Sequence, residues 1–106
     1  MENIINSYET LFVIDPRLSE DDTKAMSDRF TAMIAANGEL GKVDVWGRRR
    51  LAYPIEDQNE GYYVLAEFKS NPAFPSELER VFGITEGILR SIVVRKEEKK
   101  EKSTEM

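Results

Sequence analysis

The sequence predicts a small α+β domain with four strands and two helices. Two segments carry apolar residues at helical spacing, four are rich in aromatic and β-branched residues, and proline or glycine stands near most junctions between them. At 106 residues, the chain is long enough to bury one modest core. We therefore expect a single domain over residues 1–95, followed by a tail.

The first half of the domain is predicted to be a strand followed by a helix. Residues 8–14 (Tyr-Glu-Thr-Leu-Phe-Val-Ile) favour a strand, which Pro16 ends because proline has no backbone N–H to donate to a sheet. Ser19 is typical of a helix N-cap, with Asp22 in the matching position of a capping box. Asn37-Gly38 is a typical helix end. The apolar residues that this helix should bury are Met26, Phe30, Met33 and Ile34.

A second and a third strand are predicted for the middle of the chain. The second covers residues 39–53 and is interrupted by Gly47, where we expect a bulge or a bend. Residues 56–60 are polar and acidic, and they are predicted to form the loop of a hairpin. Residues 61–69 (Gly-Tyr-Tyr-Val-Leu-Ala-Glu-Phe-Lys) show the strongest strand pattern in the chain.

The rest of the chain is predicted to hold a helix, a strand and a charged tail. Residues 71–75, which contain two prolines, predict a connector, and a short helix then ends at Gly83. Residues 88–95 predict the fourth strand. Residues 96–106 are almost all charged or polar, and we expect this tail to be disordered. The apolar side of the short helix consists of Leu78, Val81 and Phe82.

This order of elements (strand, helix, strand, strand, helix, strand) is the split βαβ of the ferredoxin-like fold. Right-handed crossovers place both helices on one face of a four-stranded antiparallel sheet. The first and third strands would be central, and the second and fourth would lie at the edges. The opposite face of the sheet would have no helix over it.

Alternation along the two central strands predicts which side chains lie on that uncovered face. The residues suited to the helix-covered face are Thr10, Phe12, Ile14, Tyr62, Val64, Ala66 and Phe68. The residues between them would form an uncovered apolar patch, which commonly binds a protein partner or an RNA base. The alternative is a register shifted by one residue, which would bury this set instead. The four residues of the predicted patch are Leu11, Val13, Tyr63 and Leu65.

The composition excludes several classes of function. The chain contains no cysteine and no histidine, which removes disulfides, thiol nucleophiles, the usual zinc ligands and the commonest general base. No apolar run is long enough to cross a bilayer and the N-terminus lacks a secretory signal, so we expect cytoplasmic residence. The sequence shows neither a nucleophile–base arrangement nor a phosphate-cradling glycine loop. We predict no enzymatic activity, no cofactor and no metal site.

One short segment inverts the charge of an otherwise acidic chain. The net charge is −5, from 15 basic and 20 acidic residues, which argues against binding nucleic acid by charge alone. Residues 42–55, however, hold four basic residues against one acid. In this segment the arginines 48–50 stand between Trp46 and Tyr53. Guanidinium groups suit phosphate oxygens and aromatic rings suit unpaired bases, so the segment predicts a local nucleic-acid contact.

Each of these side chains also has a simpler interpretation. The arginines 48–50 equally suit a solvated strand end or ion pairs with nearby acids. Trp46 suits base stacking, cover for a partner protein, or a cap on the edge of the core. Tyr53 suits core packing as well as RNA contact. The further candidates for phosphate contact, with ordinary surface charge as the alternative, are Arg90, Arg95 and Lys96.

The uncovered face does not carry the stacking box of an RNA-recognition motif. That box gives its first, fourth, fifth and eighth positions to a basic, a small, an aromatic and an aromatic residue. The chain has Glu60, Tyr63, Val64 and Glu67 there. This mismatch favours a protein partner for the uncovered face.

Several segments together resemble the bacterial small-subunit ribosomal protein six family. The resemblance covers about residues 8–96, and the ten residues from Trp46 to Ile55 are highly specific. The family's paired arginines fall on Arg49 and Arg50, whereas the acidic residues 56–60 depart from members that carry lysines there. The segments that carry the resemblance are Trp46–Ile55 with Gly61-Tyr62-Tyr63, Tyr8–Phe12 with Asp15-Pro16, and Ile84–Arg90 with Val93-Val94-Arg95.

The resemblance implies a ferredoxin-like domain without catalytic activity. It further implies binding to the central domain of small-subunit ribosomal RNA, cooperatively with small-subunit ribosomal protein eighteen as a heterodimer. From the residues alone, a ligand-binding regulatory module that dimerises through the uncovered sheet face stays open, although it gives no account of the arginines. A phosphate-ester hydrolase would need the phosphate loop that the sequence lacks.

Overall fold

The computed structural model describes residues 5–55 and 58–96, and it gives only the backbone of residues 52–55 and 58. The elements, in chain order, are β1 (Asn6–Ile14), α1 (Glu20–Asn37), β2 (Glu39–Ile55), β3 (Gln58–Ser70), α2 (Phe74–Ile84) and β4 (Ile88–Lys96). This is the predicted order. The predicted tail begins at Lys96, which the structure includes in β4, and residues 97–106 lie outside the described part of the chain.

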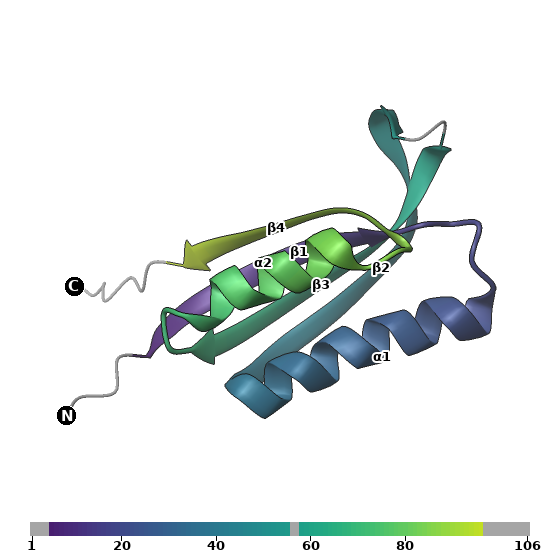
Figure 1. The fold of residues 1–106 in the computed structure, drawn as a ribbon. Coiled ribbons are helices and arrows are strands. Elements are labelled where there is room, and N and C mark those ends of the chain that lie inside the picture. The colour runs from purple at the N-terminus through teal and green to yellow at the C-terminus, as the bar shows by residue number, and fades with distance from the viewer. Residues whose placement is uncertain (1–4, 56–57, 97–106) are drawn as a thin grey trace, which may run out of the picture.

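The four strands form one antiparallel sheet in the order β2-β3-β1-β4, with both helices on one side of it (Figure 1). The central strands are therefore β1 and β3, and the edges are β2 and β4, as predicted. The long β2–β3 hairpin extends past the rest of the sheet and bends away from it (Figure 1). The predicted α+β split βαβ fold is confirmed.

The core lies between the helices and the predicted covered face of the sheet. Phe12 on β1 contacts Phe30 on α1 and Phe82 on α2, with ring centroids 4.3–5.6 Å apart within this trio. All three rings are at most 1% exposed. The predicted alternation is confirmed, because other residues predicted for the covered face of β1 and β3 are buried beside these rings. They are Thr10, Ile14, Val64, Ala66 and Phe68.

Local signals place the ends of both helices. The backbone N–H of Asp22 donates to the Ser19 hydroxyl at 3.1 Å, so Ser19 is the N-cap of α1 as predicted. The second helix begins earlier than predicted: Phe74 and Pro75, assigned to the connector, belong to α2. The Asn71 side-chain oxygen accepts the N–H of Phe74 at 3.1 Å, and proline is tolerated in the first turn because its missing N–H has no partner there.

The β2–β3 hairpin differs from the prediction in its length and its register. β3 begins at Gln58, so the loop predicted for residues 56–60 is shorter, and its first two residues lie outside the described part. The pairing of β2 with β3 shifts between Val45 and Gly47, and Gly47 has φ +81°, a conformation that favours glycine. The predicted interruption at Gly47 is therefore a β-bulge.

Candidate functional site

The uncovered face of the sheet carries an apolar surface that three strands build together. Leu11 lies directly opposite Leu65 of β3 on one side and Ile92 of β4 on the other. Val94 follows on the same face of β4, and Ile92 and Val94 are 46% and 45% exposed. We call Leu11, Tyr63, Leu65, Ile92 and Val94 the open-face patch.

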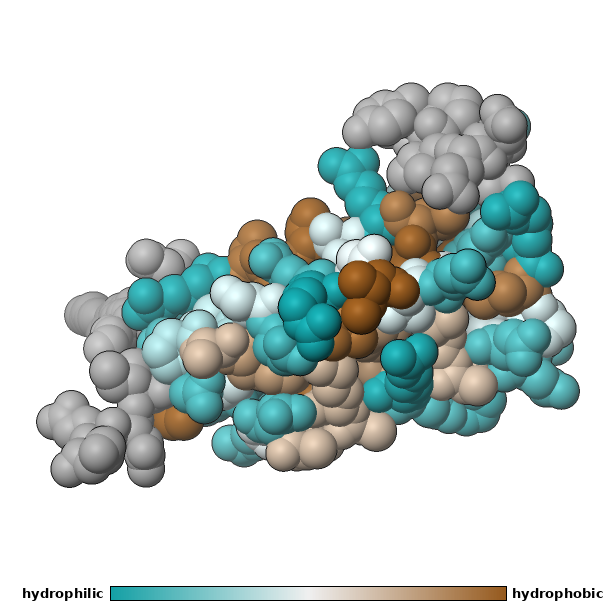
Figure 2. Space-filling model, in the orientation of Figure 1, coloured by the Kyte–Doolittle hydropathy of each residue, from teal (hydrophilic) through white to brown (hydrophobic). Residues whose placement is uncertain are grey.

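The sequence prediction missed the contribution of β4 to this patch. Ile92 and Val94 alternate with the partly buried Val93, which is a signal that the sequence contains. Figure 2, seen from the helix side, shows hydrophilic side chains spread between apolar ones.

Val13 was predicted to lie exposed in the uncovered patch, and this prediction is wrong, because the side chain is buried. It does point to the face without helices, opposite Tyr63, but it is only 3% exposed. A Cβ atom placed on Gly61 would collide with a Val13 methyl group and would lie 3.4 Å from Leu51, which is itself buried. Val13 therefore fills the space that Gly61 leaves, and the bent hairpin helps to cover it.

Trp46 and Arg49 form a compact unit at one end of the open-face patch. The indole stacks on Tyr63, with ring centroids 6.0 Å apart and planes 15° apart. The Arg49 guanidinium carbon lies 5.8 Å from the centre of the indole, and its Nε–H donates to the Trp46 carbonyl at 3.4 Å. Trp46 is still 39% exposed. We call Tyr63, Trp46 and Arg49 the aromatic–arginine stack.

The bulge at Gly47 explains why Trp46 and Arg49 share a face. Residues three apart in a regular strand point to opposite faces. Here Asp44 pairs with Leu65 but Gly47 pairs with Tyr63, so one extra residue is accommodated between them. The extra residue shifts the alternation of side chains along β2 by one position, so Trp46 and Arg49 point to the same face.

Arg48 points the other way, toward the helix side. Its guanidinium donates to the Pro16 carbonyl at 3.1 Å and lies 3.6 Å from a Glu60 carboxylate oxygen. It lines a groove between α1 and β2 together with Leu18 and Tyr62. The structure therefore separates Arg48 from Arg49, although all three arginines of the segment are exposed.

The loop that receives Arg48 contains an ion pair between the buried carboxylate of Asp15 and the exposed guanidinium of Arg17. The Arg17 guanidinium contacts the Asp15 carboxylate at 2.6 Å, and the Asp15 N–H donates to the Gly87 carbonyl at 2.8 Å. Hydrogen bonding from Arg17 holds the pKa of Asp15 below its usual value, against the opposing effect of burial. This pair therefore holds the β1–α1 loop in place beside the Pro16 carbonyl.

The remaining predicted phosphate ligands lie at both ends of β4. Arg90 is opposite Val13, so it shares a cross-strand row with Tyr63 and Gly47, but it lies on the other edge of the sheet, roughly 14 Å from the strand that carries Trp46 and Arg49. Arg95 and Lys96 are five and six residues further along β4, roughly 17–20 Å away at the rise of a strand. The side chain of Tyr53 lies outside the described part of the structure.

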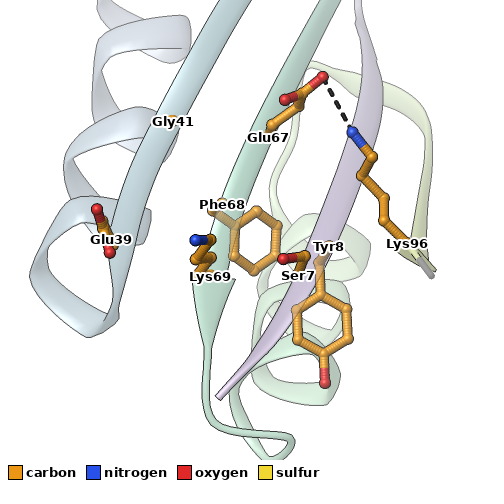
Figure 3. A pocket seen from close by; sticks show the side chains of 8 residues that line it. All are labelled: Ser7, Tyr8, Glu39, Gly41, Glu67, Phe68, Lys69 and Lys96. Atoms are coloured by element: carbon orange, nitrogen blue, oxygen red, sulfur yellow. Dashed lines mark ion pairs between the residues drawn. The ribbon is translucent and has the colours of Figure 1, made fainter. Parts of the chain in front are cut away.

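The far end of the uncovered face has balanced charges. A shallow hollow of about 300 Å³ lies there, and Lys96 pairs with Glu67 at 3.3 Å along its wall (Figure 3). Lys69 stands directly opposite Glu39 in the strand register. Two lysines are thus matched by two glutamates, and this end offers no excess of positive charge for phosphate.

Two further properties concern the described residues only. Residues 5–55 and 58–96 hold no group of three or more acidic side chains that is arranged to ligate a metal ion. Neither helix in this part of the chain is long and apolar enough to span a membrane.

Comparison with known proteins identifies the family. The model of the family described as "Ribosomal protein S6" matches residues 7–95. The chain belongs to this family. It is 52% identical over 94 residues to the small ribosomal subunit protein bS6 of Clostridium novyi, an alignment that covers 88% of this chain and 99% of the relative. It is 47% identical over 92 residues to the bS6 of Caldanaerobacter subterraneus, covering 86% and 97%.

A solved structure supports the same conclusion. The crystal structure of 30S ribosomal protein S6 from Thermotoga maritima superposes with a TM-score of 0.83 at 29% identity, over 88% of this chain and 89% of that one. The protein is therefore a structural component of the small ribosomal subunit, it is not an enzyme, and its place is the ribosome in the cytoplasm. The family membership favours the ribosomal interpretation over the regulatory module.

Proposed function

We propose that the protein binds the central domain of small-subunit ribosomal RNA together with small-subunit ribosomal protein eighteen. The observation that carries the proposal is the position of the aromatic–arginine stack. It stands where the open-face patch meets the arginine segment, with Arg90 in the same cross-strand row. One face of the sheet thus offers an apolar surface and a cationic end side by side.

The RNA contact is assigned to the phosphates near Arg49 and Arg50. Both side chains are exposed, Arg49 on the open face and Arg50, opposite Glu60, on the other face of the hairpin, and a guanidinium fork binds phosphate oxygens in a bidentate way. Arg48 plays a lesser part, because it is already engaged by the Pro16 carbonyl and Glu60. Phosphate contacts fix position and orientation with little base specificity, which suits a structural protein.

The protein partner is assigned to the open-face patch. Ile92 and Val94 are nearly half exposed beside Leu11 and Leu65. Covering an apolar patch of this kind with a partner removes it from water, which favours binding. A chain of net charge −5 binds RNA weakly by itself, whereas a basic partner on this face would extend the positive surface. Each ligand should therefore raise the affinity for the other by the same factor.

The salt dependence of RNA binding tests the arginine assignment. The variant Arg49→Ala/Arg50→Ala is titrated with central-domain RNA at several salt concentrations, with saturating protein eighteen. Loss of two phosphate contacts should reduce the slope of log K against log salt by about 1.4–1.8. The matched control Arg29→Ala/Arg80→Ala removes the same charge from the two helices and should leave the slope close to wild type. Equal slopes for both double variants would overturn the assignment.

A further inference from the structure

The sequence left three roles open for Trp46: base stacking, contact with a partner protein, or a cap on the edge of the core. Its contacts in the structure indicate a fourth role. Trp46 is on an edge strand, yet it makes two specific contacts to neighbours on its own face. The Tyr63 ring lies under the indole in a near-parallel stack. The Arg49 guanidinium makes a cation–π contact with the indole, and its Nε–H donates to the Trp46 carbonyl.

We infer that Trp46 is a positioning residue, which holds the Arg49 guanidinium in the orientation that binds an RNA phosphate. This inference rests on the proposed function, because it takes Arg49 as a phosphate ligand. Trp46 itself then contacts no base. A cation within about 6 Å of an indole centre is attracted to the ring, and 5.8 Å meets that condition.

The second contact makes the orientation specific. The Arg49 Nε–H donates to the Trp46 carbonyl, which directs one edge of the guanidinium back toward the strand. The terminal nitrogens then remain available at the surface, where arginine binds phosphate as a fork. An arginine carries many rotamers, and ordering it in advance removes part of the entropy that RNA binding would otherwise cost.

The stack on Tyr63 fixes the indole in turn. Tyr63 is on the central strand β3, directly opposite Val13 of β1, and is half-buried. The order of support therefore runs from the rigid centre of the sheet to Tyr63, then Trp46, then Arg49. The bulge at Gly47 is necessary for this arrangement, because it places Trp46 and Arg49 on one face.

A set of single and double variants tests the inference by RNA titration with saturating protein eighteen. Trp46→Leu keeps an apolar side chain but removes the ring, and the loss of a surface cation–π contact should lower RNA affinity about two- to fivefold. Trp46→Phe should keep most of the wild-type affinity. The salt slope of Trp46→Leu should stay close to wild type, since no charge is removed, whereas Arg49→Ala should lower it.

Double variants distinguish a positioning role from direct base contact. With Arg49 already replaced by alanine, Trp46→Leu should cause no further loss, because the residue through which it acts is gone. With Arg50→Ala as the matched control, the two losses should multiply. A loss from Trp46→Leu that persists undiminished in the Arg49→Ala background would overturn the inference and indicate direct contact of the indole with RNA. If Arg49→Ala alone changes neither affinity nor slope, the proposed role of Arg49 fails as well.

Discussion

Truncating Ile92 should weaken the binding of small-subunit ribosomal protein eighteen without unfolding this protein. Full burial of an isoleucine side chain is worth about 1.5–3 kcal/mol. Ile92 is 46% exposed, so a partner that covers it gains roughly half of that, about 0.7–1.4 kcal/mol. Ile92→Ala should therefore raise the Kd for the partner about three- to tenfold.

Intrinsic fluorescence offers a direct assay for this prediction. Trp46 is the only tryptophan of the chain and is half-exposed at the end of the same face, so partner docking should change its emission. Ile84→Ala is the matched control: Ile84 is 68% exposed, but it ends α2 on the helix side. Wild-type affinity in Ile92→Ala, or an equal loss in both variants, would refute the assignment of the partner to the open-face patch.

Three other predictions concern stability and are measured by denaturant unfolding. The hydrogen bond from Arg17 lowers the pKa of Asp15, so the ionised carboxylate contributes its full stabilisation of the folded state above the ordinary pKa of 3.8. The difference in unfolding free energy between wild type and Asp15→Asn should therefore be constant near neutral pH. It should shrink as the pH falls through the lower folded-state pKa. A pH-independent difference would contradict this. Ser19→Ala removes the N-cap of α1 and should cost about 1 kcal/mol, whereas Ser76→Ala in α2 should cost less. Gly61→Ala forces a methyl group against Val13 and should cost about 1–3 kcal/mol; a neutral result would show that the hairpin moves aside easily.

The sequence predicted the fold closely because its local signals agree with one another. Alternation in β1 and β3 identified the buried face, and the N-cap at Ser19 and the end at Asn37 placed α1. The start of α2 was predicted too late, because Pro75 was taken as part of a connector although proline is tolerated in the first turn of a helix.

The candidate site was less accessible to sequence reasoning, since it depends on register and bending. A glycine at position 47 indicates a bulge or a bend, but only the pairing with β3 shows that Arg49 joins Trp46 while Arg48 turns to the helix side. The burial of Val13 depends on the approach of Leu51 from the hairpin, which alternation does not describe. Arg95 and Lys96 were named as candidates for phosphate contact from their charge, and only the strand order and the length of β4 show that they lie far from the arginine segment.

Cooperative binding is tested by measuring the affinity of the wild-type protein for central-domain ribosomal RNA, with and without saturating small-subunit ribosomal protein eighteen. Cooperative binding predicts weak RNA affinity for the protein alone and a gain with the partner, on the order of the 5- to 150-fold that coupled sites commonly show. The RNA should increase the affinity for the partner by the same factor. RNA affinity that is equal with and without the partner would contradict the claim that the two ligands bind cooperatively at one face of the sheet.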